Sequence, residues 1–131
     1  MKHHEVVAAI IINNNKILCM QRNISKYEYI SLKFEFPGGK IEPGETKEQA
    51  LIREILEELN LEIEIVKNFL TIVHEYPDFK ITMHSFICTS MKTDLVLKEH
   101  FTYKWLDKSN LENLDWAAAD LPIVLKLIGE V

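Results

Sequence analysis

Three glutamates, Glu54, Glu57 and Glu58, stand at relative spacings of 0, 3 and 4 residues; we call them the acidic row. On an α-helix these spacings place side chains on one face. The dipeptide Gly38-Gly39 lies upstream and predicts a glycine-rich turn. A row of carboxylates beside such a turn is suited to Mg²⁺ bound together with the phosphates of a substrate. For the three glutamates alone, the ordinary alternative is the solvated face of an amphipathic helix.

The segment that carries the acidic row is predicted to be a helix over residues 47–59. Thr46 followed by Gln49 forms a capping box, and Asn60 stands where a left-handed C-terminal cap is expected. At about 100° per residue, the apolar side chains fall on the face away from the acidic row and are expected to be buried. These apolar residues are Ile52, Ile55, Leu56 and Leu59. One helix face is therefore predicted to meet a core, and the other to carry the chemistry.

The joint pattern is far more specific than the glutamates alone. Gly39, Glu45, Arg53 and the acidic row resemble the signature of the Nudix hydrolase family, GX5EX7REUXEEXGU, in which U is a bulky aliphatic residue. A chance match to all fixed positions in this chain is on the order of 10⁻⁶ to 10⁻⁵. The last glycine of the signature is Asn60 here, a departure that concerns a helix cap rather than a ligand.

The resemblance extends beyond the signature to the MutT branch of the family. Residues 34–46, FEFPGGKIEPGET, are similar to the glycine-turn region of that branch. Residues 5–12 resemble its opening strand and residues 114–127 its closing helix, so the likeness spans nearly the whole chain. It implies the Nudix fold, an α/β structure in which a mixed β-sheet is sandwiched between helices (an α/β/α sandwich).

The resemblance also implies metal ligands. Glu54, Glu57 and Glu58 are similar to the residues that bind Mg²⁺ in the family, with Mn²⁺ as a substitute, and the carbonyl of Gly38 is a further expected ligand. Glu54 also matches the residue that orients or deprotonates the attacking water. Glu99 aligns with a distal glutamate that serves as an extra metal ligand or base, and a solvated surface glutamate is the alternative.

Four further positions are implied to support catalysis or bind phosphate. Arg53 and Glu45 resemble a pair that braces the glycine turn against the helix, and Lys40 and Arg22 resemble positions that contact phosphates. A nucleoside triphosphate brings about four negative charges to a row of carboxylates, so divalent cations must lie between them.

The implied reaction is attack of water on the β-phosphorus of a nucleoside triphosphate, which releases a monophosphate and pyrophosphate. The expected substrate is a modified or oxidised nucleotide such as 8-oxo-dGTP, in nucleotide-pool sanitation; a CTP or 5-methyl-dCTP pyrophosphohydrolase is the alternative. A non-catalytic Nudix ligand-binding domain is a further alternative, although such domains typically lose carboxylates that remain here. Hydrolysis of dinucleotides, ADP-ribose or nucleotide sugars also stays open, as does a purely structural role.

The base would be recognised by Asp120, which aligns with the base-reading position of MutT-like enzymes, and Tyr76 and Phe79 are candidates for stacking. An ionised aspartate only accepts hydrogen bonds. It suits the amino group of cytosine or the N7–H of 8-oxoguanine, and it opposes unmodified guanine, whose N7 and O6 are acceptors. Asp120 could instead serve only as a helix cap, and the aromatic residues could instead lie in the core or at its rim.

Composition sets the wider limits. The 131 residues predict a single domain over residues 1–131. A net charge of −5 without a basic stripe argues against nucleic acid polymers but not against a free nucleotide. Cys19 and Cys88 are expected to be buried, unpaired thiols in a cytoplasmic protein. The N-terminus has no signal-peptide pattern, His3 and His4 are expected in a flexible tail, and no apolar run is long enough for a membrane span. A monomer and a homodimer both remain open.

The remaining elements are predicted from apolar runs and turn residues. Residues 6–12 form a continuous apolar run, typical of a central strand buried on both faces. Asn13-Asn14-Asn15 predicts a turn into the next strand. Further strands are expected near residues 16–21, 35–36, 40–41, 62–74, 79–89 and 103–106, with a loop over residues 23–33. A final helix is expected over residues 121–128, with Pro122 in its first turn.

Overall fold

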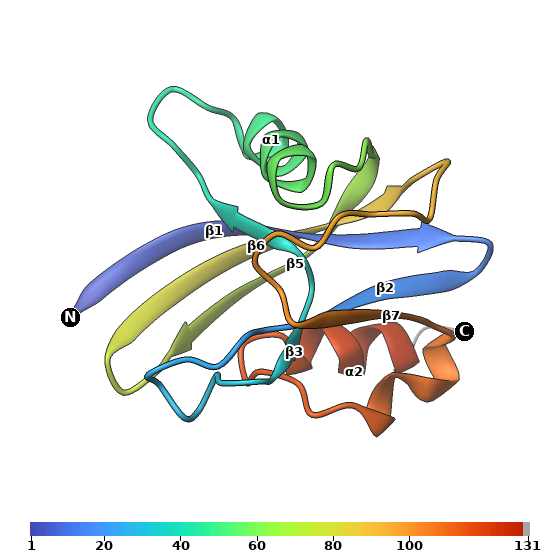
Figure 1. The fold of residues 1–131 in the computed structure, drawn as a ribbon. Coiled ribbons are helices and arrows are strands. Elements are labelled where there is room, and N and C mark those ends of the chain that lie inside the picture. Colours follow the sequence, from blue (N-terminus) through green and yellow to red (C-terminus); the bar gives the residue numbers. More distant parts are fainter. Residues whose placement is uncertain (130–131) are drawn as a thin grey trace.

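The computed structural model of the protein describes residues 1–129, which form a seven-stranded sheet with helices on both faces. The strands are β1 (Lys2–Asn13), β2 (Lys16–Gln21), β3 (Phe34–Glu35), β4 (Gly38–Lys40), β5 (Glu64–Glu75), β6 (Phe79–Thr89) and β7 (Thr102–Leu106). The helices are α1 (Lys47–Leu59), the 3₁₀ helix η1 (Lys108–Asn113) and α2 (Leu121–Gly129). Figure 1 shows α1 on one face of the sheet and α2 on the other, so the predicted α/β/α sandwich is confirmed.

Strand β1 lies in the middle of the sheet because its side chains are apolar on both faces. The strand order is β3-β2-β1-β6-β5, with β4 also paired to β1 and β7 to β2. β1 is parallel to β6 and antiparallel to β2 and β4, so the sheet is mixed. Asn14 and Asn15 turn the chain into β2 with φ values of 51° and 65°. Asparagine tolerates this left-handed conformation in a two-residue hairpin turn.

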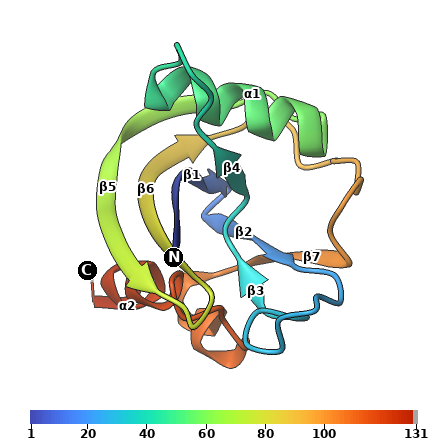
Figure 2. The same ribbon diagram turned by 90° about the vertical axis from the view of Figure 1, so that its left-hand side faces the viewer.

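The alternation of side chains along β1 divides the core into two clusters. Val7, Ala9 and Ile11 belong to the cluster that packs against α1, and Ala8 and Ile10 belong to the cluster that packs against α2. All five are at most 1% exposed. Figure 2 shows the sheet curving between the two helices, which explains why both faces of its central strand are covered.

Helix α1 begins and ends where the sequence predicts. The Thr46 hydroxyl accepts a hydrogen bond from the Gln49 N–H at 3.1 Å, and the Gln49 side chain accepts one from the Thr46 N–H at 2.9 Å. Asn60 ends the helix in the left-handed conformation, with φ of 52°. An asparagine can therefore take the place of the signature glycine at this cap.

The buried face of α1 differs from the prediction at two positions. Leu51, Ile55 and Leu59 are at most 1% exposed, whereas Ile52 and Leu56 are 44% and 45% exposed. The sheet covers a narrow stripe of residues four positions apart, centred on Ile55, and the next residues around the helix face solvent. The prediction that Ile52 and Leu56 are buried was wrong because it assumed a wider contact.

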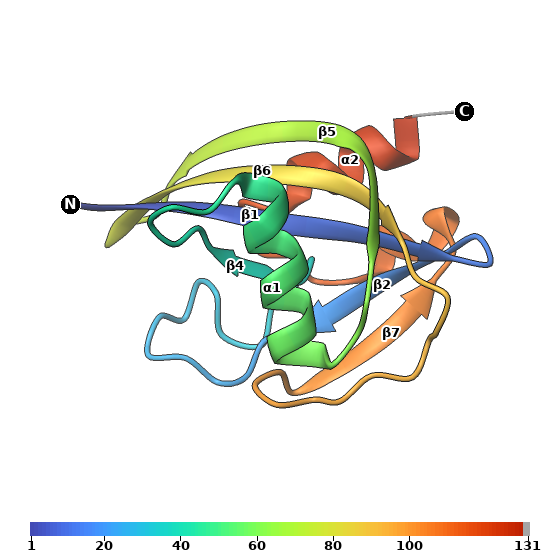
Figure 3. The same ribbon diagram turned by 90° about the horizontal axis from the view of Figure 1, so that it is seen from above.

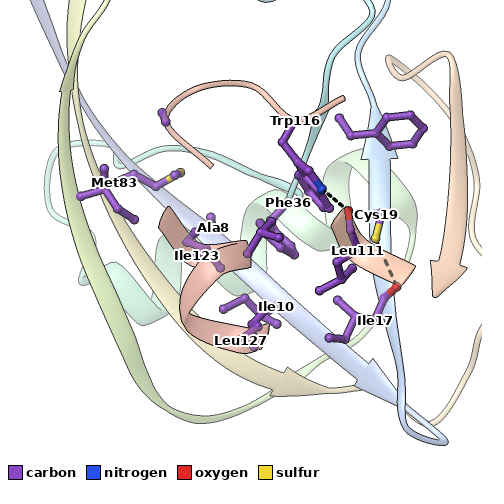
Figure 4. Close-up of a cluster of buried hydrophobic side chains, with 14 of the residues drawn as sticks. Ala8, Ile10, Ile17, Cys19, Phe36, Met83, Leu111, Trp116, Ile123 and Leu127 are labelled. Carbon is purple, nitrogen blue, oxygen red and sulfur yellow. Dashed lines mark hydrogen bonds between the residues drawn. The ribbon is translucent and has the colours of Figure 1, made fainter. Parts of the chain in front are cut away.

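The core cluster under α2 includes Phe36, which lies between β3 and β4 (Figure 4). Ile123 and Leu127 of α2 pack in the cluster that contains Phe36 and Trp116. The Trp116 indole N–H donates to the Leu111 carbonyl at 2.7 Å, and its ring stacks on Phe36 with centroids 4.7 Å apart. Leu111 lies in η1, which the sequence did not predict. The aromatic stack thus anchors β3 and η1 together.

Elsewhere the predictions differ mainly at element ends. β4 begins earlier than predicted because the glycines themselves pair with β1. β3 begins one residue earlier than predicted, because Phe34 pairs with Gln21 of β2. His3 and His4, expected in a flexible tail, lie in β1, which pairs with β6 from Lys2 onward. Cys19 and Cys88 are buried and free, as predicted. Across residues 1–129, none of the helices combines the length and apolar character that a membrane crossing requires.

Candidate active site

A cavity of about 670 Å³ lies beside β1 and β4, with further walls from β3, β6 and the segment between β2 and β3. Acidic side chains reach it in two groups. Glu58 of the acidic row lines it together with Glu99, and so do Glu35 and Asp120, which we call the buried acid pair. The predicted site residues that line the cavity are Arg22, Gly38, Lys40, Glu58, Tyr76, Phe79, Glu99 and Asp120.

Gly38 and Gly39, which were predicted to form a turn, lie instead in strand β4, and Gly39 is directly against Glu54 of the acidic row. The prediction of a turn was wrong because both glycines pair with β1. A Cβ added at Gly39 would overlap the carboxylate of Glu54, and a Cβ added at Gly38 would overlap the carbonyl oxygen of Val7. Both positions therefore need glycine because of close approach. Any residue larger than glycine at position 39 would push the Glu54 carboxylate aside.

Arg53 links the acidic row to the loop that precedes α1. Its Nε and Nη2 donate to the two oxygens of Glu45 at 2.6 and 2.9 Å, and Nη2 also donates to the Lys40 carbonyl at 3.1 Å. Its Nη1 donates to Glu54 at 3.0 Å and to Glu57 at 3.2 Å. The hydrogen bond from Arg53 is the main reason why the pKa of Glu45 falls to about 2. The Arg53 guanidinium thus donates hydrogen bonds to three carboxylates.

Glu58 shows that the acidic row is short of positive charge. Burial raises the pKa of Glu58, and the nearby Glu54, Glu99 and Glu35 carboxylates raise it further, to about 8. A carboxyl group among like charges takes up either a proton or a cation. The oxygen-only donor set is the kind that Mg²⁺ prefers, so these residues fit a hard divalent cation.

Glu57 stands apart from the rest of the row. Its side chain is 62% exposed and reaches the row through Arg53 rather than through the cavity wall. Among residues 1–129, no three His, Cys, Asp or Glu side chains form a ready-made metal cage. Mg²⁺ in phosphate-binding enzymes is usually held by one or two carboxylates with water and substrate phosphates, so a complete protein cage is not required.

Glu99 lines the cavity and belongs to the segment between β6 and β7. This segment runs past the end of α1 (Figure 3) and is hydrogen-bonded to it. The Val96 N–H donates to the Leu59 carbonyl at 2.9 Å, and the Lys98 ammonium donates to the Glu57 carbonyl at 2.7 Å. Both bonds use carbonyls that a helix leaves without partners at its C-terminal end. These two hydrogen bonds hold the segment where the charge of Glu99 raises the pKa of Glu58.

In the buried acid pair, Glu35 is held between two basic side chains. Arg22 donates from Nη1 to Glu35 Oε1 at 3.0 Å, and His100 lies with Nε2 at 2.9 Å from Glu35 Oε2. Burial opposes ionisation of Glu35, but the hydrogen bond from His100 and the charge of Arg22 outweigh it, and its pKa is lowered. Neither Glu35 nor His100 was predicted as a site residue. A signal was present for Glu35, since it alternates with Phe34 and Phe36.

Asp120 is 5% exposed, and its side chain bonds to the residue that follows β3 rather than to its own helix. Its Oδ2 accepts a hydrogen bond from the Phe36 N–H at 2.9 Å, while the start of α2 is capped by its backbone carbonyl, which accepts from Ile123 at 3.0 Å. Burial, followed by the charge of Glu35, raises the pKa of Asp120 well above its usual range. The sequence argument considered only the ionised form of Asp120, whereas its burial favours the protonated form more than in a free aspartate. A protonated carboxyl can donate as well as accept.

The aromatic residues form a stack along the cavity wall. Tyr76 and Tyr29 are parallel with centroids 5.3 Å apart, and Phe79 lies 5.1 Å from Tyr76. The Tyr76 hydroxyl accepts from the Ala119 N–H at 2.9 Å, and Tyr29 donates to Asp78 at 2.7 Å. Tyr29 covers one face of Tyr76, which is 5% exposed, and this favours a wall position over free stacking on a base. Tyr29 joins the loop after β2 to the turn between β5 and β6.

Comparison with known proteins agrees with the geometry. Residues 2–127 match the NUDIX domain family. An 8-oxo-dGTP diphosphatase of Escherichia coli (strain K12) is 32% identical over 127 residues, covering 97% of this chain and 98% of the relative. A CTP pyrophosphohydrolase of the same strain is 35% identical over 124 residues, covering 95% of this chain and 90% of the relative.

A solved structure is similar over the full length of both chains. It is the solution NMR structure of DNA mismatch repair protein MutT, a Nudix-family hydrolase from methicillin-resistant Staphylococcus aureus 252, with 40% identity and a TM-score of 0.76. Nudix hydrolases generally use divalent metal ions, which agrees with the oxygen donors of the acidic row. The glutamates of the signature lie beside Gly39, and the family match covers nearly the whole length of the chain. This chain therefore belongs to the Nudix hydrolase family.

Proposed function

We propose that this protein is a Mg²⁺-dependent nucleoside triphosphate pyrophosphohydrolase of the MutT type. It converts an oxidised or otherwise modified nucleotide such as 8-oxo-dGTP to the monophosphate and pyrophosphate. The observation that carries the proposal is the acidic row set against Gly39 at a cavity of about 670 Å³, a size that suits a small-molecule ligand. The activities of two relatives, at 32% and 35% identity, support the same class of reaction.

The metal would be held at the acidic row, with Mn²⁺ able to substitute for Mg²⁺. The proposed ligands are Glu54, Glu57, Glu58, the carbonyl of Gly38 and Glu99. When bound, the cation neutralises phosphate oxygens and polarises the reacting phosphorus. Arg53 holds the carboxylates of Glu54 and Glu57 in place, and Glu45 holds Arg53.

Glu54 is assigned to the attacking water. Arg53 donates to its Oε1, so we assign the water to Oε2, which faces Gly39. A carboxylate in this position orients the water and accepts its proton as the bond to phosphorus forms. Lys40 and Arg22 line the cavity and are assigned to contact the phosphates.

Asp120 is assigned to the edge of the base. In its protonated form, which burial favours, its carboxyl can donate to O6 of 8-oxoguanine and accept from N7–H, whereas unmodified guanine presents an acceptor at N7. The same carboxyl can donate to N3 of cytosine and accept from its amino group, and one relative is a CTP pyrophosphohydrolase. CTP or 5-methyl-dCTP is therefore the second candidate substrate.

The test is pyrophosphate release with Mg²⁺ from 8-oxo-dGTP, dGTP, CTP and 5-methyl-dCTP. We expect the rate on 8-oxo-dGTP, or on the two cytosine nucleotides, to exceed the rate on dGTP, and EDTA to abolish release. Equal rates on all four nucleotides would remove the selective pocket. No release from any of them would leave a non-catalytic ligand-binding Nudix domain as the function.

A further inference from the structure

Three segments that are distant in the sequence meet at the carboxylate of Glu35. Arg22 comes from the end of β2, Glu35 from β3, and His100 from the segment before β7. Arg22 takes one carboxylate oxygen and His100 the other. Because an ionised carboxylate only accepts, the Nε2 of His100 carries the hydrogen of this bond. Glu35 is thereby fixed at both oxygens.

His100 is itself held firmly. Its side chain is 8% exposed, and in the described part of the chain its Nδ1 is buried without a hydrogen-bond partner. On either side, the Glu99 carbonyl accepts from the Asn23 amide, and the Phe101 N–H donates to the Gln21 carbonyl at 2.9 Å. The bond to Glu35 is therefore the polar contact that orients the imidazole.

Glu35 is followed directly by Phe36, whose N–H donates to Asp120. One peptide unit therefore joins Glu35 to the hydrogen bond that orients Asp120. Glu35 also acts on Asp120 through its charge. His100 lies beyond Glu35 on this path and lines the same cavity.

We propose that His100 is a positioning residue of the base pocket: by fixing Glu35 it orients Asp120 and determines which base edge the pocket accepts. The proposal rests on the proposed function, since it concerns the nucleotide that the pocket selects. Without the imidazole, Glu35 keeps Arg22 as its basic partner and can rotate, so the donor and acceptor pattern facing the base is no longer fixed.

The experiment compares His100→Ala and His100→Gln with the wild type. The Gln amide can donate to Glu35 in place of Nε2–H, so it tests whether the hydrogen bond rather than the ring is needed. His84→Ala is the matched control, because His84 also lies near a carboxylate, Glu5, and is 14% exposed, but it lines a different hollow. The readouts are kcat and KM for 8-oxo-dGTP, dGTP and CTP, and calorimetric affinities for the corresponding monophosphates.

We expect His100→Ala to reduce the preference among bases by about tenfold, the effect of one hydrogen bond to a charged group. The loss should fall on KM and on monophosphate affinity, with kcat largely kept. His100→Gln should restore most of the preference, and His84→Ala should leave it unchanged. Circular dichroism and thermal melting check the fold of each variant.

Three results would overturn the proposal. The first is a folded His100→Ala variant with unchanged base preference, or with kcat reduced equally on every nucleotide. The second is a folded His100→Gln variant no better than His100→Ala. The third is a wild type whose monophosphate affinities show no base preference. If the wild type binds monophosphates selectively but releases no pyrophosphate, the proposed function fails, and the binding ratios still decide the role of His100.

Discussion

The two acidic groups of the cavity are built from the same chemical groups but are balanced in opposite ways. In the acidic row, Arg53 is shared among Glu45, Glu54 and Glu57, and Glu58 is left with a pKa raised to about 8. In the buried acid pair, Arg22 and His100 bond to the two oxygens of one carboxyl, and a backbone N–H bonds to the other carboxyl. The row therefore fits the external cation that we propose for it, whereas Glu35 and Asp120 find their partners within the chain. The partners, rather than the residue type, set the chemistry of each group.

The largest effect should come from removing charge in the acidic row. Glu54→Gln should lower kcat by about 10²- to 10⁴-fold because a carboxylate that positions and deprotonates water is lost. Glu57→Gln should lower turnover and weaken Mn²⁺ binding, measured by titration calorimetry, with the fold intact. Glu48→Gln, on the exposed first turn of the same helix, is the control and should retain activity. Near-wild-type rates in both test variants would remove these residues from the mechanism.

The next effect concerns two glycines, Gly39 in β4 and Gly44 in the loop before α1. Gly39→Ala should reduce kcat by about tenfold or more, because its Cβ would displace the Glu54 carboxylate from the water that it orients. Gly44→Ala should leave kcat unchanged and lower stability by about 1 kcal/mol, because Gly44 has φ of 84° and open space around it. Steady-state kinetics and urea unfolding separate the two. Equal kinetic losses in both variants would contradict the contact argument.

In the buried acid pair, Asp120→Ala should reduce base selectivity, measured by the ratio of kcat/KM for 8-oxo-dGTP and dGTP. Asp120→Asn, which can still accept from Phe36, should change the dependence of stability on pH. The folded state raises the pKa of Asp120, so it binds a proton more tightly than the unfolded chain. Wild-type stability therefore falls as pH rises from the unfolded pKa toward the folded pKa. Urea unfolding from pH 5 to pH 8 should show a smaller fall for Asp120→Asn, and identical slopes would contradict the assignment.

The smallest effect is expected at the edge of the acidic row. The pKa of Glu45 is lowered from 4.5 to about 2 by Arg53, so this contact stabilises the fold fully above the unfolded pKa. Its contribution is lost as pH falls from about 4.5 to about 2. Thermal melting over that range should therefore show a slightly steeper loss for the wild type than for Glu45→Gln. Parallel curves would indicate that the pair is fully screened by solvent.

The sequence predicted the features that depend on local interactions. The helix over residues 47–59, its capping box and the strand over residues 79–89 coincide with the structure, because caps and apolar runs act over a few residues. The signature located Gly39, Glu45, Arg53 and the acidic row because its fixed positions lie within a short stretch of the sequence. Those predictions needed little knowledge of the rest of the chain.

The features that were missed depend on contacts across the chain. His100 meets Glu35 across 65 positions, and Phe36 meets Asp120 across 84. No spacing rule reaches that far, so the contacts of the buried acid pair and the raised pKa of Asp120 could not be predicted. The exposure of Ile52 and Leu56 has the same origin, because the curvature of the sheet decides how much of α1 is covered.

The bond from Lys98 to the Glu57 carbonyl ties two parts of the molecule mechanically. Lys98 lies next to Glu99 in the sequence, so its bond to the last turn of α1 links the segment that carries Glu99 to the helix that carries Glu58. Lys98→Met, which removes this bond, is therefore expected to alter the placement of Glu99 relative to Glu58 although Lys98 itself does not line the cavity.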